Sequence, residues 1–240
     1  MTRLLHLAGA LGTVTATLLA MALLSTSGAR EQRRRSGRTF DWMVQIDDSP
    51  RWSSTCVAVV IGSHWAIAPT HCLASGRAYL RTRSAVHVSS SIHSLEGRDL
   101  SLIDFPHSIL LDDFAPVPLA SVEADRAPRW GARKYWIILP SGRLGEAKIV
   151  DISSTLISAT TDAFPLCYGD SGRPLLREDA DGEFQVAGLL SYGDARCRSG
   201  GINRYARIDT WTVREHLPQP TEFHRQQARE HRADTARYER

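Results

Sequence analysis

The sequence of 240 residues lacks the motifs that would point to a cofactor or to nucleic acid. None of its four cysteines forms a CxxC pair, so neither a zinc site nor a thioredoxin-like redox site is indicated. We find no internal repeat and no metal or nucleotide motif, and the sequence therefore predicts no cofactor. The formal net charge is only +3, and its arginines concentrate in residues 30–38 and in the C-terminal tail. Nucleic acid is therefore not an expected partner.

The chain is long enough, and at 42% hydrophobic residues apolar enough, to bury one sizeable core or two smaller ones. Short segments rich in β-branched and aromatic residues follow one another from Phe40 to Arg207, separated by Gly, Ser or Pro. This pattern predicts an all-β sandwich or barrel rather than βαβ units. Eleven strands are predicted, at 42–46, 56–62, 65–70, 79–84, 86–90, 100–105, 134–140, 147–154, 156–161, 184–193 and 203–208.

The N-terminal region has the outline of an export signal. Residues 4–24 are almost wholly apolar, and Ser27-Gly28-Ala29 offers the small residues that a signal peptidase needs. We predict a signal peptide at 1–29, with a membrane anchor as the alternative, because this stretch of 21 residues, broken only by His6 and small residues, is long enough to span a bilayer. The basic linker or propeptide at 30–38 opposes export by its charge.

Two further segments organise the chain. Residues 110–131 carry three prolines and divide the β-rich region into two halves. After Ile208, Asp209 is a plausible N-cap, and the spacing of the following apolar residues predicts a helix that Pro218 ends. Residues 218–240 form a charged tail, predicted to be either a solvated helix or disordered.

The four cysteines are Cys56, Cys72, Cys167 and Cys197. An even number behind an export signal favours two disulfides, for which three connectivities are possible. Sequential pairing would close two loops of moderate length and stabilise the fold by very roughly 3 kcal/mol for each bond.

Three residues fit the roles of nucleophilic serine catalysis. "GDSG" (169–172) places Ser171 between small residues, where the amides of Gly169 and Ser171 would face a developing oxyanion. "WAIAPTHC" places His71 beside a cysteine, as the base. "GRDLSLIDF" places Asp99 at the start of an apolar strand, where a carboxylate holds an imidazole in one tautomer.

Two alternatives arise from these motifs. The order His, Asp, Ser and the presence of Arg173 two residues after Ser171 exclude the GxSxG elbow of an α/β-hydrolase. Asp104 competes with Asp99 for the role of orienting His71. The two aspartates differ by an odd number of positions, so a strand would present them on opposite faces.

With these motifs in order, the chain resembles the trypsin-like (chymotrypsin-fold) serine proteases over residues 40–217. The matching stretches are "FDWMVQI", "CVAVVIGSHWAIAPTHC", "RDLSLIDF", "CYGDSGRPLL", "VAGLLSYG" and "NRYARI". The resemblance implies a peptidase domain at 39–217, built from two packed six-stranded antiparallel β-barrels with a C-terminal helix. It further implies a secreted endopeptidase that forms an acyl-enzyme on protein or peptide substrates and acts as a monomer. Contact with a membrane is expected only if the N-terminal segment stays uncleaved.

The resemblance also assigns roles to individual residues. Ser171 would be the nucleophile, His71 the base and Asp99 its orienting carboxylate, with the oxyanion hole at Gly169 and Ser171. The family's disulfides match Cys56–Cys72 and Cys167–Cys197, and disulfides require an oxidising compartment, which supports export. The short span from His71 to Asp99 leaves little room for the calcium loop of some relatives.

The substrate pocket implied by the resemblance is suited to a neutral, apolar side chain. Its base matches Pro165 where a trypsin has aspartate, so cleavage after Lys or Arg is not expected. In an alternative interpretation, Arg196 reaches the pocket and favours an acidic side chain of the substrate. The pocket residues are Pro165, Leu166, Ser191, Tyr192, Gly193 and Asn203.

One departure from the family concerns activation. Zymogen-derived members pair a new Ile or Val N-terminus with the aspartate matching Asp170, and no such element precedes "FDWMVQI". A buried carboxylate without a partner is costly, so Arg173, which replaces a glycine of the family, is either its counter-ion or a residue that points to solvent. The departure also supports a second hypothesis, in which the chain is a catalytically weak binding or regulatory module.

Overall fold

The computed structural model describes residues 40–52, 56–82, 85–109, 119, 133–179, 181–208 and 213. The described residues fall into two units, one made of those within 41–138 and 145–213 and the other of Phe40 and residues 139–144. The second unit includes Phe40 and a tight turn in which the Leu139 amide donates to the Arg143 carbonyl at 2.8 Å. The first unit holds every described strand, apart from the first residue of β9. No helix within the described ranges is long and apolar enough to cross a membrane.

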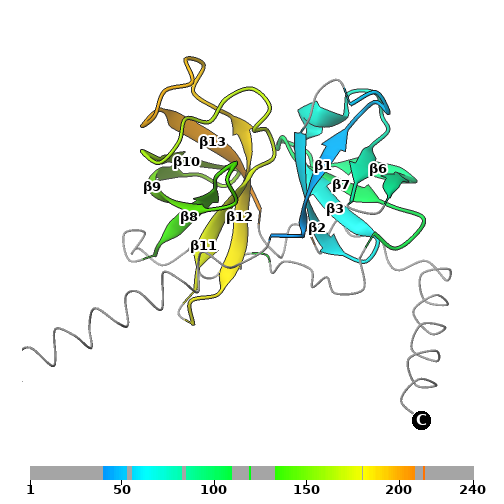
Figure 1. Ribbon diagram of the computed structural model, residues 1–240, viewed down its shortest axis with the longest axis horizontal. Coiled ribbons are helices and arrows are strands. Elements are labelled where there is room, and N and C mark those ends of the chain that lie inside the picture. The colour runs from blue at the N-terminus through cyan, green and yellow to red at the C-terminus, as the bar shows by residue number, and fades with distance from the viewer. Residues whose placement is uncertain are drawn as a thin grey trace, which may run out of the picture. The chain divides into compact units, whose positions relative to one another are not determined.

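The N-terminal half of the chain forms a seven-stranded antiparallel sheet in the order β5-β4-β1-β2-β3-β7-β6, drawn from blue to green in Figure 1. A short 3-10 helix, η1 (Thr70–Leu73), follows β3. The strands are β1 (Met43–Asp47), β2 (Cys56–Gly62), β3 (Trp65–Ala68), β4 (Tyr79–Arg81), β5 (Val86–Val88), β6 (Ser91–Ser94) and β7 (Ser101–Asp104).

The two edge strands of this sheet, β5 and β6, are consecutive pieces of chain separated by Ser89 and Ser90. The Ser89 amide donates to the Ala78 carbonyl before β4, and the Ser90 amide donates to the Asp104 carbonyl at the end of β7, both at 2.9 Å. The chain therefore crosses from one edge of the sheet to the other within two residues. The sheet is closed by the chain itself rather than by a ladder between β5 and β6.

The C-terminal half forms a closed barrel in the order β10-β13-β12-β11-β8-β9 (Figure 1). The long strand β12 is buried over most of its length, and it pairs with β11 on one side and β13 on the other. The strands are β8 (Tyr135–Ile138), β9 (Leu144–Ile152), β10 (Leu156–Thr160), β11 (Pro174–Glu178), β12 (Phe184–Tyr192) and β13 (Ile202–Arg207).

The all-β class predicted from the sequence agrees with this architecture, but the prediction of two six-stranded barrels needs a correction. One barrel has six strands and is closed, whereas the other half is a seven-stranded sheet, because the Ser89-Ser90 step splits one strand into β5 and β6. The predicted C-terminal helix lies outside the described residues, except for Val213, which is helical and buried. The predicted signal peptide, basic linker and charged tail also lie outside them, as does the proline-rich 110–131 segment apart from Leu119.

All eleven predicted strands are present, and the structure adds β6 and β11. The β6 segment, Ser-Ile-His-Ser, has a single aliphatic residue, and β11 starts at a proline and ends in charged residues. Neither has the apolar alternation by which a strand is recognised in sequence. Both are held by their neighbours, β6 by β7 and β11 by β8 and β12.

Each half has its own apolar core. In the N-terminal sheet, Ile46, Val60 and Leu80 bury their side chains together with those of η1. In the barrel, Ile137, Leu175 and others are fully buried. Burial of a Val, Leu or Ile side chain contributes roughly 1.5–3 kcal/mol, so these cores dominate the stability of the fold.

A close backbone contact joins the two halves beside Ser171. The amide of Val57, in β2, donates to the Ser171 carbonyl at 2.8 Å. The next residue, Gly172, has φ of +85°, and a Cβ added to it would lie 1.8 Å from the carbonyl oxygen of Val57. Only glycine fits at this position, because any side chain would force the two backbones apart.

We predict that Gly172→Ala lowers the free energy of unfolding by roughly 2 to 5 kcal/mol, from the left-handed backbone and the overlap with Val57 together. Gly76→Ala is the matched control, because Gly76 has φ of +75° but open space around it. It should cost only about 1 to 2 kcal/mol. Urea unfolding of both variants measures the difference, and equal losses would show that the Val57 contact does not constrain the fold.

Candidate active site

His71 lies on η1, whose position is fixed from two sides. The disulfide Cys56–Cys72 ties the residue after His71 to the first residue of β2. On the other side, the Thr70 hydroxyl is hydrogen-bonded at 2.9 Å to the hydroxyl of Ser101, which is fully buried at the start of β7. The ring is therefore held in place by its two sequence neighbours.

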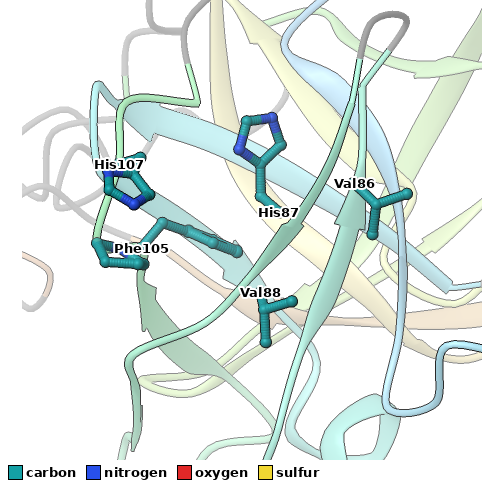
Figure 2. Close-up of a pocket in the computed structure, with 6 residues that line it drawn as sticks. Val86, His87, Val88, Phe105 and His107 are labelled. Atoms are coloured by element: carbon teal, nitrogen blue, oxygen red, sulfur yellow. The ribbon is translucent and has the colours of Figure 1, made fainter.

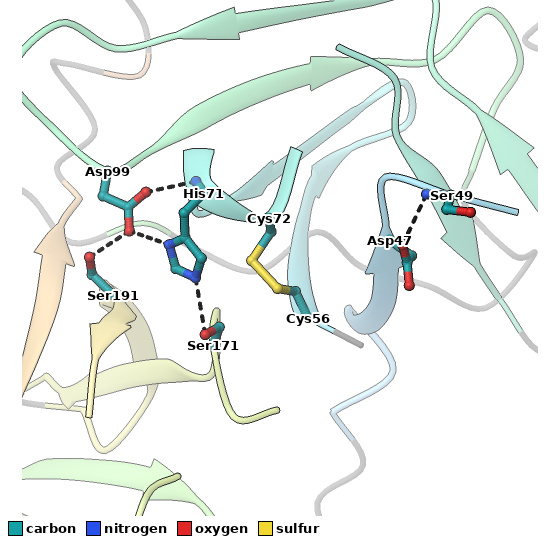
Figure 3. Close-up of a disulfide and its surroundings, with 8 residues drawn as sticks. All are labelled: Asp47, Ser49, Cys56, His71, Cys72, Asp99, Ser171 and Ser191. Carbon is teal, nitrogen blue, oxygen red and sulfur yellow. Dashed lines mark hydrogen bonds and ion pairs between the residues drawn. A yellow bond between two sulfur atoms is a disulfide. The ribbon is translucent and has the colours of Figure 1, made fainter. Parts of the chain in front are cut away.

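His71 connects Asp99 to Ser171 in a chain of hydrogen bonds (Figure 3). Its Nδ1 lies 2.7 Å from Asp99 Oδ2, and its Nε2 lies 3.1 Å from Ser171 Oγ. The backbone amide of His71 also donates to Asp99 Oδ1 at 3.0 Å. The three residues come from η1, from the turn before β7 and from the loop before β11, and both ring nitrogens of His71 are engaged in the arrangement that proton transfer requires.

Ser191, at the end of β12, is a fourth member of this cluster. Its hydroxyl donates to Asp99 Oδ2 at 2.5 Å, so the carboxylate accepts three hydrogen bonds. The resemblance assigns Ser191 to the substrate pocket and gives no indication of its contact with Asp99. The "LLSYG" motif carries no signal for it, because the contact joins residues that are 92 positions apart.

The electrostatics of Asp99 favour the ionised carboxylate. Burial opposes ionisation, but the hydrogen bonds from His71 and Ser191 outweigh it and hold the pKa of Asp99 below its usual value. An ionised Asp99 keeps the Nδ1 proton on His71, which leaves Nε2 free to accept the proton of Ser171.

Asp104 is not part of this cluster. Its Oδ2 accepts a hydrogen bond from the Ser90 hydroxyl at 2.8 Å, at the far end of β7 from Asp99. The structure therefore selects Asp99 as the partner of His71.

Two amides beside Ser171 are free of hydrogen bonds within the described residues. The amides of Asp170, Gly172 and Arg173 donate to carbonyl oxygens of the protein. In the part of the chain that the structure describes, the Gly169 and Ser171 amides donate no hydrogen bond. These are the two donors predicted for an oxyanion hole, and Gly169 adopts φ of +90° between them.

Two of the predicted pocket segments, those of Leu166 and Gly193, are packed closely against each other. A Cβ added to Gly193 would lie 2.9 Å from the Leu166 carbonyl oxygen, so the two backbone segments are in contact. Leu166 is buried and Pro165 half-buried, while Tyr192 is exposed.

The side-chain amide of Asn203 is also hydrogen-bonded within the protein. It is buried, accepts a hydrogen bond from the Asp194 amide and donates one to the Gly201 carbonyl. This packing leaves little room for a large side chain between Leu166 and Gly193.

The predicted disulfide Cys167–Cys197 is not formed, and this prediction is corrected. The two residues are neighbouring thiols, and the hydrogen bond with Cys197, together with burial and nearby negative charge, raises the pKa of Cys167 to about 11.

Arg173 forms an ion pair with Asp170. Its Nε lies 2.5 Å from Asp170 Oδ1, and both side chains are largely buried. The prediction that Arg173 points to solvent is therefore wrong, and the counter-ion alternative describes the structure.

Two other features lie near the N-terminal sheet, a cluster of possible metal ligands and a cavity. Cys56, His71 and Cys72 cluster closely enough to suggest a metal, but the two sulfurs are bonded to each other and His71 is engaged on both nitrogens. A separate cavity of about 270 Å³ is lined by none of Asp99, His71 and Ser171 (Figure 2). His87 lies at its wall, and the pKa of His87 is lowered first by burial and then by the charge of His107. It is lined by Val86, His87, Val88, Phe105, Pro106 and His107.

Comparison with known proteins supports a chymotrypsin-like family at low identity, and a protease function in general. The chain is 40% identical to spermosin of Halocynthia roretzi over 55 residues, which are 23% of this chain and only 14% of spermosin. It is 23% identical to proproteinase E of Bos taurus over 204 residues, which cover 65% of this chain and 80% of that protein. No family model matches the chain.

We predict that Asp99→Asn removes a pH-dependent part of the stability. Because the folded pKa of Asp99 is lowered, its ionisation stabilises the fold above the usual carboxyl pKa of about 3.9, and this stabilisation is lost as the pH falls through the lower folded pKa. The difference in unfolding free energy between wild type and variant should be constant at pH 5 to 7 and should narrow below about pH 4. Urea unfolding at each pH measures it, and a difference that grows in acid would contradict the lowered pKa.

Proposed function

We propose that the chain is a serine endopeptidase that cleaves peptide bonds through an acyl-enzyme on Ser171. The observation that carries the proposal is the chain of hydrogen bonds from Asp99 through His71 to Ser171, with two unpaired amides beside the serine. The distant relatives support a protease in general, and the geometry supports the roles that we propose for the three residues.

In the first half of the reaction, Ser171 Oγ attacks the peptide carbonyl while its proton passes to His71 Nε2. The carbonyl oxygen becomes an oxyanion, to which the Gly169 and Ser171 amides donate. His71 then gives the proton to the leaving amine, and an ester of Ser171 remains. Each oxyanion donor is worth about 3 kcal/mol in the transition state.

In the second half, His71 takes a proton from water as the water attacks the ester, and returns it to Ser171 Oγ as the acid product leaves. Asp99 remains an anion throughout and stabilises the cationic imidazole, while the Ser191 hydroxyl and the His71 amide hold the carboxylate in place. This mechanism requires no metal or organic cofactor.

We further propose that the enzyme is exported and acts on uncharged, small side chains rather than on Lys or Arg. The Cys56–Cys72 disulfide supports an oxidising compartment. Two observations support a small, neutral pocket: the contact between Leu166 and Gly193, and the hydrogen bond that Asn203 accepts from the Asp194 amide. The alternative role of Arg196, which would favour an acidic residue, is an outcome of the profiling experiment below.

A fluorophosphonate probe tests the nucleophile. We expect stoichiometric labelling of Ser171 in the full chain, and none in Ser171→Ala. Both Ser171→Ala and His71→Ala should lower kcat by roughly 10⁵ to 10⁶-fold, and Asp99→Asn by roughly 10³ to 10⁴-fold.

Asp104→Asn is the matched control for Asp99→Asn, because Asp104 lies on the same segment but faces Ser90. Its kcat should equal that of wild type. A folded wild-type protein that takes up no probe would instead favour the second hypothesis, a protease-like binding or regulatory module.

Profiling with a peptide library tests the specificity. We expect cleavage after small uncharged residues, with at least tenfold lower kcat/KM for Lys and Arg, because no carboxylate stands at the Pro165 position. A preference for Lys or Arg would contradict the neutral pocket, a preference for large aromatic residues would contradict its small size, and a preference for acidic residues would assign Arg196 to the pocket.

A further inference from the structure

Residues 167–173, which we call the oxyanion loop, are organised around the carboxylate of Asp170. Its Oδ2 accepts the Cys167 amide at 2.9 Å, and its Oδ1 faces Arg173 Nε. The Asp170 amide donates back to the Cys167 carbonyl, and the Arg173 amide donates to the Asp170 carbonyl. The loop thus consists of two consecutive turns, and the Asp170 carboxylate is bonded to Cys167 at one end and to Arg173 at the other.

Arg173 also connects this loop to the barrel. Its Nη1 donates to the carbonyl of Ile138, the last residue of β8, at 3.3 Å. Its backbone carbonyl accepts the Leu190 amide of β12 at 2.9 Å. A single side chain therefore bridges the Asp170 carboxylate and β8.

The charge on Asp170 needs this partner. The Asp170 side chain is 11% exposed and that of Arg173 is 14% exposed, so neither ion is well solvated. Two further ionisable groups among the described residues interact with the Asp170 carboxylate, and neither is a cation. They are Cys167, whose pKa is raised in part by Asp170, and the buried Tyr205, whose pKa is raised first by burial and then by Asp170. Removing one member of a buried pair leaves an uncompensated charge.

The free amides of Gly169 and Ser171 lie on either side of Asp170. Their directions depend on the two turns, because the neighbouring amides of Asp170, Gly172 and Arg173 are all used inside the protein. If the carboxylate left its place, the turns would lose their shared acceptor, and the two donors would no longer converge.

We propose that Arg173 is a positioning residue that holds the oxyanion loop in its working form, by pairing with Asp170 from within the loop. The inference rests on the proposed peptidase function. Because the cation lies three residues from the carboxylate, the pair forms as soon as the loop folds. The oxyanion hole then requires no positive charge from a newly formed N-terminus, and the protein is active without an activating cleavage.

Arg173→Gly, which leaves an open space at the guanidinium, tests the proposal. We expect kcat to fall by about 10² to 10³-fold, the effect of losing an oxyanion donor, with a much smaller change in KM. Methylguanidinium at millimolar concentration should restore kcat by at least tenfold, and Arg173→Lys should retain more activity than Arg173→Gln. Lys148→Gln is the matched control, since it breaks an exposed ion pair with Asp162 and should change nothing.

Hydrogen exchange provides a readout that does not depend on activity. The amides of Asp170, Gly172 and Arg173 should exchange at least tenfold faster in Arg173→Gly than in wild type, while those of β2 stay protected. Should Arg173→Gly not fold, Arg173→Gln and Arg173→Lys carry the same comparison.

The outcomes separate the two proposals. A wild-type chain that neither cleaves peptides nor takes up the probe overturns the peptidase function, and the exchange measurement still decides the role of Arg173. An active wild type with an Arg173→Gly or Arg173→Gln variant of equal kcat and equal exchange rates overturns the positioning role alone.

Discussion

The arrangement of the active site depends on two adjacent residues at the start of β2. Cys56 is bonded to Cys72, the residue that follows His71, and Val57 donates its amide to the carbonyl of Ser171. His71 and Ser171 are 100 positions apart in the sequence, yet the segments that carry them are both bonded to residues 56–57. The distance of 3.1 Å between Nε2 and Oγ is therefore set by local geometry rather than by the packing of two whole sheets. A Cβ at Gly172 would lie 1.8 Å from the Val57 carbonyl oxygen, so relieving this overlap would move Ser171 away from His71.

Asp99 also connects the two halves of the chain. Its carboxylate accepts hydrogen bonds from the backbone amide and the ring of His71 in the N-terminal half, and from the hydroxyl of Ser191 in the C-terminal half. Another hydrogen bond between the halves comes from its neighbour, Arg98, whose Nη1 donates to the Arg207 carbonyl at 2.8 Å. The carboxylate thus stabilises the imidazole and also ties the two halves together at the place where the chemistry is proposed to occur.

Much of this architecture was predictable from the sequence, for identifiable reasons. The strands with β-branched and aromatic residues were found, and the serine, histidine and aspartate were recognised because each lies in a distinctive short motif. The strands β6 and β11 were missed because their stability comes from neighbouring strands rather than from their own composition. The contact of Ser191 with Asp99 and the separate thiols of Cys167 and Cys197 were also not predicted, since both depend on distances between segments far apart in sequence. Arg173 lies between these cases. Its position next to the serine raised the question, but only the observed 2.5 Å contact decided between ion pair and solvent.

The two serines that carry the chain from β5 to β6 have a consequence for how the protein behaves in concentrated solution. An open sheet presents a row of unpaired amides and carbonyls at each edge, on which another chain can form a further strand. Here the amides of Ser89 and Ser90 are bonded to both margins of the sheet, so the outermost strands are parts of one continuous segment. Two small polar residues thereby limit β5 and β6 to three and four residues, which shortens the edges on which another chain could form a strand.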